Sequence, residues 1–177
     1  MDKTDISALT SRLEKLEDLE AIRHTWRDYC IRLDSEDWSG LQDVFCEDAA
    51  LEMSGLNTLI QGVDGVYRGR IGIVEEFYRP AIVEAAAENA GLMATGHLST
   101  NMQIDLKGDE ATTLAYFFEI VANNQILIGT YQHLAKREPD RWRFKFLRIS
   151  IRYSAKVAVE DLGGQSLQNV MAQPYSA

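Results

Sequence analysis

The sequence predicts a single α+β domain, a cone-shaped α+β barrel in which N-terminal helices pack on a curved antiparallel sheet. Two observations indicate this fold class. In the first part of the chain, apolar residues recur at every third or fourth position, as in amphipathic helices. After residue 95 the chain is rich in β-branched and aromatic residues with short turn signals between them, as in hairpins. We assign residues 1–157 to this domain and residues 158–177, which lack clear periodicity, to a C-terminal tail.

Three helices are expected before the sheet. The first should end at Asp34, where its apolar stripe stops, and Ser35 or Asp37 should cap a short second helix. A third is predicted over residues 71–89, bent at Pro80 and stopped by Gly91. The stripe of the first helix consists of Leu9, Leu13, Leu16, Leu19, Ile22, Trp26, Tyr29 and Leu33, and that of the second of Trp38, Leu41 and Phe45.

One short strand is predicted at residues 49–53, and four longer strands should follow the third helix. Short turns, such as the one around Gly108, separate the longer strands. We therefore expect consecutive hairpins and an antiparallel sheet. The four strands are expected at residues 96–106, 110–122, 125–137 and 141–155.

Charge and hydropathy exclude several classes of function. The chain has 18 Lys and Arg residues against 27 Asp and Glu residues, a formal net charge of −9, so its field repels nucleic acids and anionic membrane surfaces. No apolar run approaches the roughly 20 residues that span a bilayer. The N-terminus is too acidic and polar for a secretory signal. We therefore expect a cytoplasmic protein without nucleic-acid or membrane partners.

The cysteines and most histidines do not indicate chemistry. Cys30 and Cys46 lie in apolar helical patterns and are interpreted as packing residues. The histidines form no close ligand pair, so no metal site is expected, and the glycine motifs of phosphate and dinucleotide sites are absent, so no cofactor is expected. His24 is interpreted as solvated, and His133 as a surface or interface residue.

His97 and Asp34 are the strongest candidates for catalysis, because each lies at the end of a predicted element, where pockets commonly open. A carboxylate beside an imidazole fixes its tautomer and stabilises the imidazolium, whereas burial lowers the imidazole pKa. The pair could thus be a general base near neutral pH. Alternatively, His97 is an ordinary strand residue and Asp34 only ends the helix.

Three segments, taken in order, resemble one family. They are residues 22–48, which contain Tyr29, Asp34, Asp37 and Trp38; residues 96–101; and residues 140–144 with the following strand to Tyr153. They are similar to segments of SnoaL-like proteins in the nuclear transport factor 2-like (NTF2-like) superfamily, over roughly residues 8–157. The chain is most similar to the branch with scytalone dehydratase, bile-acid 7-alpha dehydratase and hexachlorocyclohexane dehydrochlorinase.

This resemblance implies a catalytic dyad of His97 and Asp34, with Tyr29 and Arg152 as further catalytic residues. From the residues alone, Tyr29 is as well explained as part of the apolar core, and Arg152 could equally face outward. The two dehydratases also have an active-site tyrosine on the strand after the second helix. This chain has Leu51, Glu52 and Met53 there.

A pocket between the helices and the sheet is expected to bind the substrate. The predicted substrate-binding residues are Asn101, Trp26, Phe118 and Thr130. Asn101 shares the strand parity of His97, whereas Leu98, Met102, Ile104 and Leu106 share the other parity. Either the polar row faces the pocket and the apolar row faces another sheet or subunit, or a β-bulge exchanges the two faces.

The expected function is a cofactor-independent lyase, a dehydratase or dehydrohalogenase acting on a hydrophobic small molecule. His97 would remove a proton from carbon while Tyr29 or Arg152 assists departure of hydroxide or halide. One alternative is a ketosteroid-isomerase-like proton transfer by a carboxylate. Another is a non-catalytic module, a ligand binder or a dioxygenase small subunit. We expect a homotrimer or homodimer that associates through sheet faces.

Overall fold

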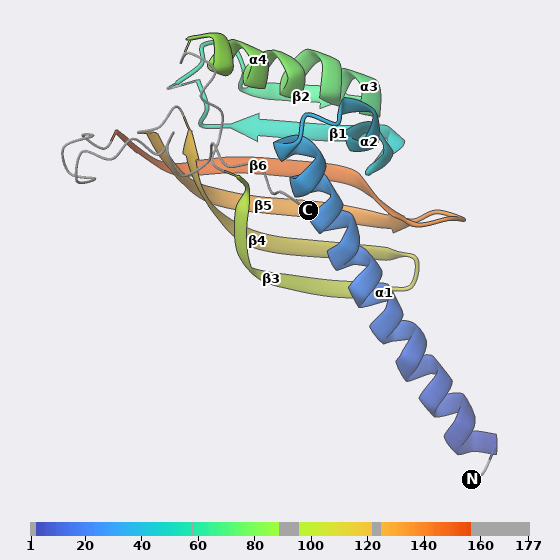
Figure 1. Ribbon diagram of the computed structural model, residues 1–177. Coiled ribbons are helices and arrows are strands. Elements are labelled where there is room, and N and C mark those ends of the chain that lie inside the picture. The colour runs from blue at the N-terminus through green and yellow to red at the C-terminus, as the bar shows by residue number, and fades with distance from the viewer. Residues whose placement is uncertain (1–2, 58, 89–95, 122–124, 157–177) are drawn as a thin grey trace, which may run out of the picture.

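A six-stranded sheet crossed by one long helix forms the body of the molecule (Figure 1). The computed structural model describes residues 3–57, 59–88, 96–121 and 125–156. The helices are α1 (Lys3–Asp34), α2 (Trp38–Asp43), α3 (Arg70–Gly72), the π-helical η1 (Ile73–Tyr78) and α4 (Arg79–Glu88). The strands are β1 (Phe45–Ser54), β2 (Gly65–Arg68), β3 (Leu98–Lys107), β4 (Glu110–Val121), β5 (Gln125–Arg137) and β6 (Trp142–Lys156). Among these residues, no helix combines the length and apolarity needed to cross a membrane.

The helix ends follow local signals in the sequence. As predicted, α1 ends at Asp34, and the N-cap of α2 is Asp37, whose carboxylate accepts a hydrogen bond from the Gly40 amide at 3.0 Å. Phe45, predicted in the second helix, instead begins β1, because α2 is only six residues long. The third predicted helix is interrupted by η1, just before Pro80. Its predicted end, the stop at Gly91 and the C-terminal tail lie outside the described residues.

Strands β3 to β6 form the predicted run of antiparallel hairpins. The prediction of a purely antiparallel sheet was wrong, since β1 adds to the edge of β6 in parallel and β2 pairs with β1, giving the order β2-β1-β6-β5-β4-β3. A parallel pair has no connecting turn to reveal it in the sequence. The confirmed fold class is therefore α+β with a mixed sheet.

The core lies between α1, η1 and the face of the sheet that packs against them, which we name the inner face. Trp26 of α1 contacts Tyr131 of β5, with ring centroids 4.9 Å apart. Thr25 donates a hydrogen bond from its hydroxyl to the Trp142 carbonyl at 2.8 Å, which ties the same helix to β6. Cys30 and Cys46 are buried and free, as expected for packing residues.

A β-bulge in β3 exchanges the faces of this strand. Thr100 pairs with Tyr116 and Gln103 with Leu114, so two residues of β3 oppose one residue of β4. Asn101, at this bulge, has a left-handed φ of 55°, which asparagine tolerates better than most residues. Beyond the bulge, the side chains that pack against the core are Met102, Ile104 and Leu106. The second of the two predicted alternatives therefore holds, and these three residues do not face another subunit.

Candidate active site

Asp34 and His97 meet at the inner face, although 63 residues separate them in the chain. The ring Nδ1 of His97 lies 2.5 Å from Asp34 Oδ1, and the backbone N–H of His97 donates to Asp34 Oδ2 at 3.1 Å. The preceding residue, Gly96, has a φ of 112°, a conformation that a side chain would strain. Asp34 thus holds both the backbone and the ring of His97.

Glu119 lies on the other side of the same ring. Its Oε1 is 3.5 Å from Nε2 of His97, and the side chains of Glu119 and His97 are only 13% and 10% exposed. We did not identify Glu119 from the sequence. The sequence did contain a signal. Within residues 114–121 of β4, Glu119 is the one charged residue among apolar and aromatic residues, and a buried charge needs a partner.

The electrostatics of this cluster balance opposed effects. Burial lowers the pKa of His97, but Glu119 and Asp34 together raise it, and the net result is above the ordinary value of 6.5. Burial raises the pKa of Glu119, Asp34 raises it further, and His97 opposes both. Because His97 and Glu119 face one another, these two groups titrate as a unit. A histidine between two carboxyl groups is suited to proton transfer. Within the described residues, no three His, Cys, Asp or Glu side chains are grouped to hold a metal ion.

A pair of buried tyrosines lies beside His97. The hydroxyls of Tyr29 and Tyr78 are 2.7 Å apart, and the ring of Tyr29 meets that of His97 edge to face at 6.1 Å. Burial raises the pKa of both tyrosines, so their hydroxyls stay protonated at neutral pH and can donate. Tyr29 is thus part of the core and also adjoins the dyad. Tyr78 was missed, because η1 gives no regular helical spacing by which to align it.

Trp26 and Asn101, two predicted substrate-binding residues, each contact residues other than His97. Trp26 is 7% exposed and stacks on Tyr29 at 5.0 Å, and Tyr29 in turn contacts the ring of His97. Asn101 is exposed at the β3 bulge, where its Oδ1 accepts a hydrogen bond from the Thr100 hydroxyl at 3.4 Å. Substrate contacts for both residues stay predictions.

Phe118 and Thr130 lie on the outer face of the sheet, opposite to the cluster. Side chains alternate along a strand, and Glu119 faces inward, so its neighbour Phe118 faces outward. Thr130 pairs with Tyr116, which shares the parity of Phe118. The structure therefore does not bring these two predicted substrate-binding residues to His97.

Arg152 is the extra residue of a second β-bulge. Ile151 pairs with Gly129 and Tyr153 with Ile128, so Arg152 has no residue of its own opposite it. Its side chain is exposed. A bulge can redirect a side chain, and this is why alternation alone could not decide which way Arg152 faces. Its catalytic role stays a prediction.

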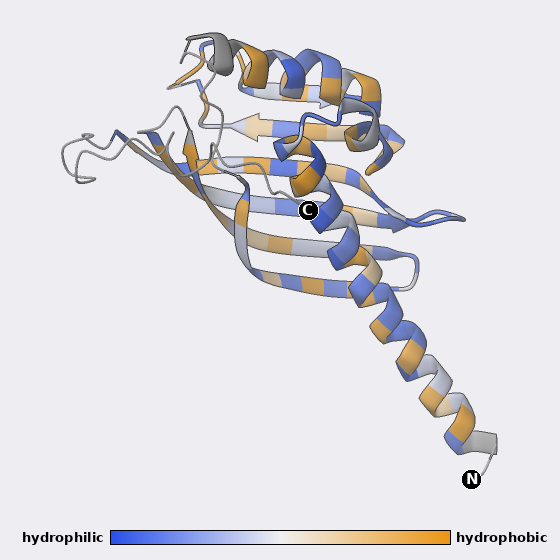
Figure 2. Ribbon diagram, viewed as in Figure 1, coloured by the Kyte–Doolittle hydropathy of each residue, from blue (hydrophilic) through white to orange (hydrophobic). Residues whose placement is uncertain are grey.

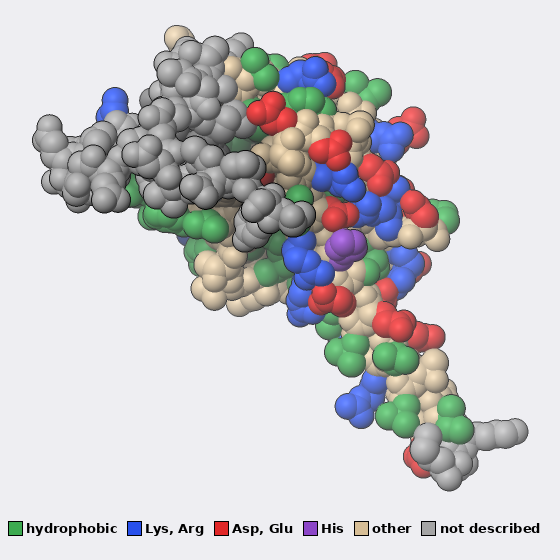
Figure 3. Space-filling view, viewed as in Figure 1, with side chains coloured by type: hydrophobic (Ala, Val, Ile, Leu, Met, Phe, Trp, Pro, Cys, Tyr) green, Lys and Arg blue, Asp and Glu red, His purple; other side chains and the backbone are tan. Residues whose placement is uncertain are grey.

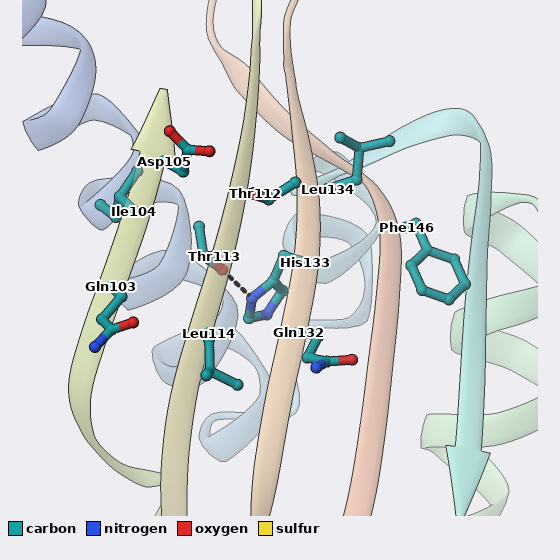
Figure 4. Close-up of a pocket in the computed structure, with 10 residues that line it drawn as sticks. All are labelled: Gln103, Ile104, Asp105, Thr112, Thr113, Leu114, Gln132, His133, Leu134 and Phe146. Atoms are coloured by element: carbon teal, nitrogen blue, oxygen red, sulfur yellow. Dashed lines mark hydrogen bonds between the residues drawn. The ribbon is translucent and has the colours of Figure 1, made fainter. Parts of the chain in front are cut away.

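His133 is buried, so its interpretation as a surface or interface residue was wrong. It is 3% exposed, and its ring stacks on that of Phe144 with centroids 4.4 Å apart. Its Nδ1 lies 2.6 Å from the Thr113 hydroxyl (Figure 4). Burial lowers its pKa to about 3, so it is neutral at physiological pH. A hollow of about 520 Å³ lies beside it, and its lining includes Gln103, Thr112, Leu114, Gln132, Leu134 and Phe146 (Figure 4).

The fold and the cluster together define a small α+β domain of NTF2-like architecture, with a histidine between two carboxyl groups on the inner face of its sheet. A family model identifies it further. The model of the SnoaL-like domain matches residues 14–148, and the chain belongs to this family. No curated protein sequence matches the chain.

Solved structures agree with this assignment. An NTF2-like protein with a cystatin-like fold from Novosphingobium aromaticivorans is 19% identical, with 98% of this chain and 100% of that chain covered and a TM-score of 0.65. A hexachlorocyclohexane dehydrochlorinase from Novosphingobium barchaimii is 18% identical, with 83% and 94% covered and a TM-score of 0.65. A proposed scytalone dehydratase from Novosphingobium aromaticivorans is 19% identical, with 82% and 91% covered and a TM-score of 0.63. The predicted family and fold are confirmed.

Proposed function

We propose that the protein is a cofactor-independent lyase that eliminates water or halide from a hydrophobic small molecule. The observation that carries this proposal is the placement of His97, whose Nδ1 is held by Asp34 while Nε2 points to the second carboxyl group, Glu119. The solved dehydrochlorinase supports the reaction class through its similar fold. The aromatic side chains around the dyad favour an apolar substrate.

In the proposed reaction, Nε2 of His97 takes a proton from the carbon next to the one that bears the leaving group. The electrons of the broken C–H bond form the C=C bond, and the bond to hydroxide or halide breaks with its electron pair. Asp34 keeps the proton on Nδ1 and stabilises the imidazolium. The neutral Tyr29–Tyr78 pair donates to the departing group.

The activity should rise with pH, with a midpoint above 6.5, because the base must be neutral and the pKa of His97 is raised. Glu119→Gln should move this midpoint to lower pH, since it removes a negative charge that favours the imidazolium. The measurement is kcat/KM against pH. Glu110→Gln, an exposed change on the same strand, is the control and should leave the profile unchanged. An unmoved midpoint in Glu119→Gln would rule out this coupling.

Elimination is tested directly by the mass of the product. Purified protein is incubated with small cyclic alcohols and chlorinated hydrocarbons, and the products are analysed by mass spectrometry. Loss of water or hydrogen chloride, absent in His97→Ala, is the expected result. Ligand binding without any product in either protein would instead support a non-catalytic binding module.

A ketosteroid-isomerase-like proton transfer is the second candidate, and Glu119 favours it. A buried carboxyl group with a raised pKa is suited to act as a base, and the Tyr29–Tyr78 hydroxyls could stabilise an enolate. In that case the product has the mass of the substrate. Glu119→Gln would then abolish activity, whereas His97→Ala would retain part of it.

We also propose that the outer sheet face mediates homo-oligomerisation, as a trimer or a dimer. An exposed apolar row crosses four strands, because each member pairs with the next, and it consists of Leu98, Phe118, Ile128 and Tyr153. Phe118→Asp should therefore lower the sedimentation coefficient of the assembly. Glu110→Gln, at the far end of β4, should not change it. A wild-type protein that sediments as a 20.0 kDa monomer would contradict this assembly.

A further inference from the structure

The first half of α1 extends beyond the sheet without packing on it (Figure 1). Every residue from 5 to 17 is exposed. Contact with the sheet begins at Asp18, whose carboxylate accepts a hydrogen bond from the Trp142 indole at 3.2 Å and pairs with Arg137. This segment continues a helix that is packed from Asp18 onward, and its own side chains are free to contact another surface.

Hydrophobic residues recur along the ribbon of the projecting segment (Figure 2), and apolar side chains lie on its surface (Figure 3). Ile6, Leu9, Leu13 and Leu16 are 50%, 48%, 56% and 62% exposed. Their spacing of three, four and three residues is that of the a and d positions of a coiled coil, with Ile6 and Leu13 at a and Leu9 and Leu16 at d. We name these four residues the N-terminal stripe.

The N-terminal stripe faces away from the sheet of its own chain. Leu13 and the core residue Ile22 are nine residues apart, and a helix turns about 100° per residue, so they lie on opposite sides of α1. The single stripe predicted from the sequence is thus two stripes on different sides. A partner helix on the N-terminal stripe would meet no obstruction from the sheet, which lies on the other side of α1.

The charges beside the stripe complement those of a second copy in parallel orientation. Arg12 occupies a g position and Glu17 the next e position, and in a parallel pair the g residue of one helix faces this e residue of the other. Both residues are exposed. Two symmetric Arg12–Glu17 pairs would flank the stripe. In an antiparallel pair Arg12 and Glu17 would not meet, because there e faces e and g faces g.

We propose that the N-terminal stripe binds the same stripe of a second copy, as a short parallel coiled coil. The two sheets then lie on the outer sides of the paired helices. This contact does not involve the outer sheet face. Each helix pair would therefore link two oligomers, each of which is held together through its outer sheet faces.

A cysteine at the seam tests the contact and its orientation. Leu9→Cys places thiols of two copies next to each other across a parallel d layer, so mild oxidation should yield a covalent dimer on non-reducing gels. Ser11→Cys, on the opposite side of the helix, is the matched control and should stay largely monomeric. Cys30 and Cys46 are buried and do not interfere. No excess of dimer in Leu9→Cys over Ser11→Cys would overturn the proposal.

Charge exchange provides an independent test. Arg12→Glu alone and Glu17→Arg alone each place like charges across the seam, so each should weaken self-association several-fold in sedimentation equilibrium. Mixed together, the two variants restore opposite charges in both pairs and should form a heterodimer preferentially. The parallel pairing would be excluded if Arg12→Glu weakened self-association and Glu17→Arg did not. It would also be excluded if the mixture showed no preference for the heterodimer.

Discussion

His97→Ala should reduce turnover almost to zero, and Asp34→Asn should reduce it by about 10³- to 10⁴-fold with the fold intact. The geometry explains the second effect. Asp34 uses one oxygen for the His97 backbone N–H and the other for ring Nδ1. An amide has only one oxygen, so if that oxygen keeps the backbone bond, the amide nitrogen donates to Nδ1. The proton then lies on Nε2, and the ring cannot act as a base.

The losses of activity caused by these two substitutions should not be additive. Because Asp34 acts through His97, the double variant should be little worse than His97→Ala alone. The measurement is kcat/KM for the four proteins of the cycle, with circular dichroism to check the fold and Glu36→Gln, an exposed change beyond the end of α1, as control. Full activity in His97→Ala would rule out elimination by this base. An inactive Asp34→Asn variant beside an active His97→Ala variant would instead favour Asp34 itself as a carboxylate base.

Trp26→Ala should lower the free energy of unfolding by about 3–5 kcal/mol, the range for removing a large buried aromatic side chain. Trp26 packs against Tyr29, Tyr131 and His133 with ring centroids 4.7 to 5.0 Å away, so its loss leaves a cavity at the centre of the core. Urea unfolding at constant pH measures this effect. Trp26→Phe, which keeps an aromatic ring, should lower the free energy of unfolding clearly less than Trp26→Ala does.

The same variants decide whether Trp26 also contacts substrate. If it acts through the core alone, Trp26→Phe should leave KM close to the wild-type value. A large rise in KM with little loss of stability would show instead that Trp26 binds substrate directly, as the sequence reasoning predicted.

Features that depend on neighbouring residues were predictable from the sequence. The end of α1 at Asp34, the cap at Asp37 and the four hairpin strands are each specified by a local signal: the end of an apolar stripe, a capping side chain or a turn. The resemblance to SnoaL-like proteins added the pairing of His97 with Asp34, which spacing alone left open.

The rest of the site was decided by contacts between residues distant in the chain. The parallel pairing of β1 with β6 involves no connecting turn that could be recognised in the sequence. The bulge at Asn101 can be recognised only when β3 is aligned with β4. That bulge determines which side chains of β3 share the inner face with His97. Glu119 and Tyr78 reach the site from a strand and a π-helical turn with no sequence spacing to His97, so only the tertiary structure could place them there. The sequence thus determined the end of the long helix and the four hairpin strands. The pairing of strands determined which polar side chains meet, because side-chain direction in a sheet depends on register as well as on the residue.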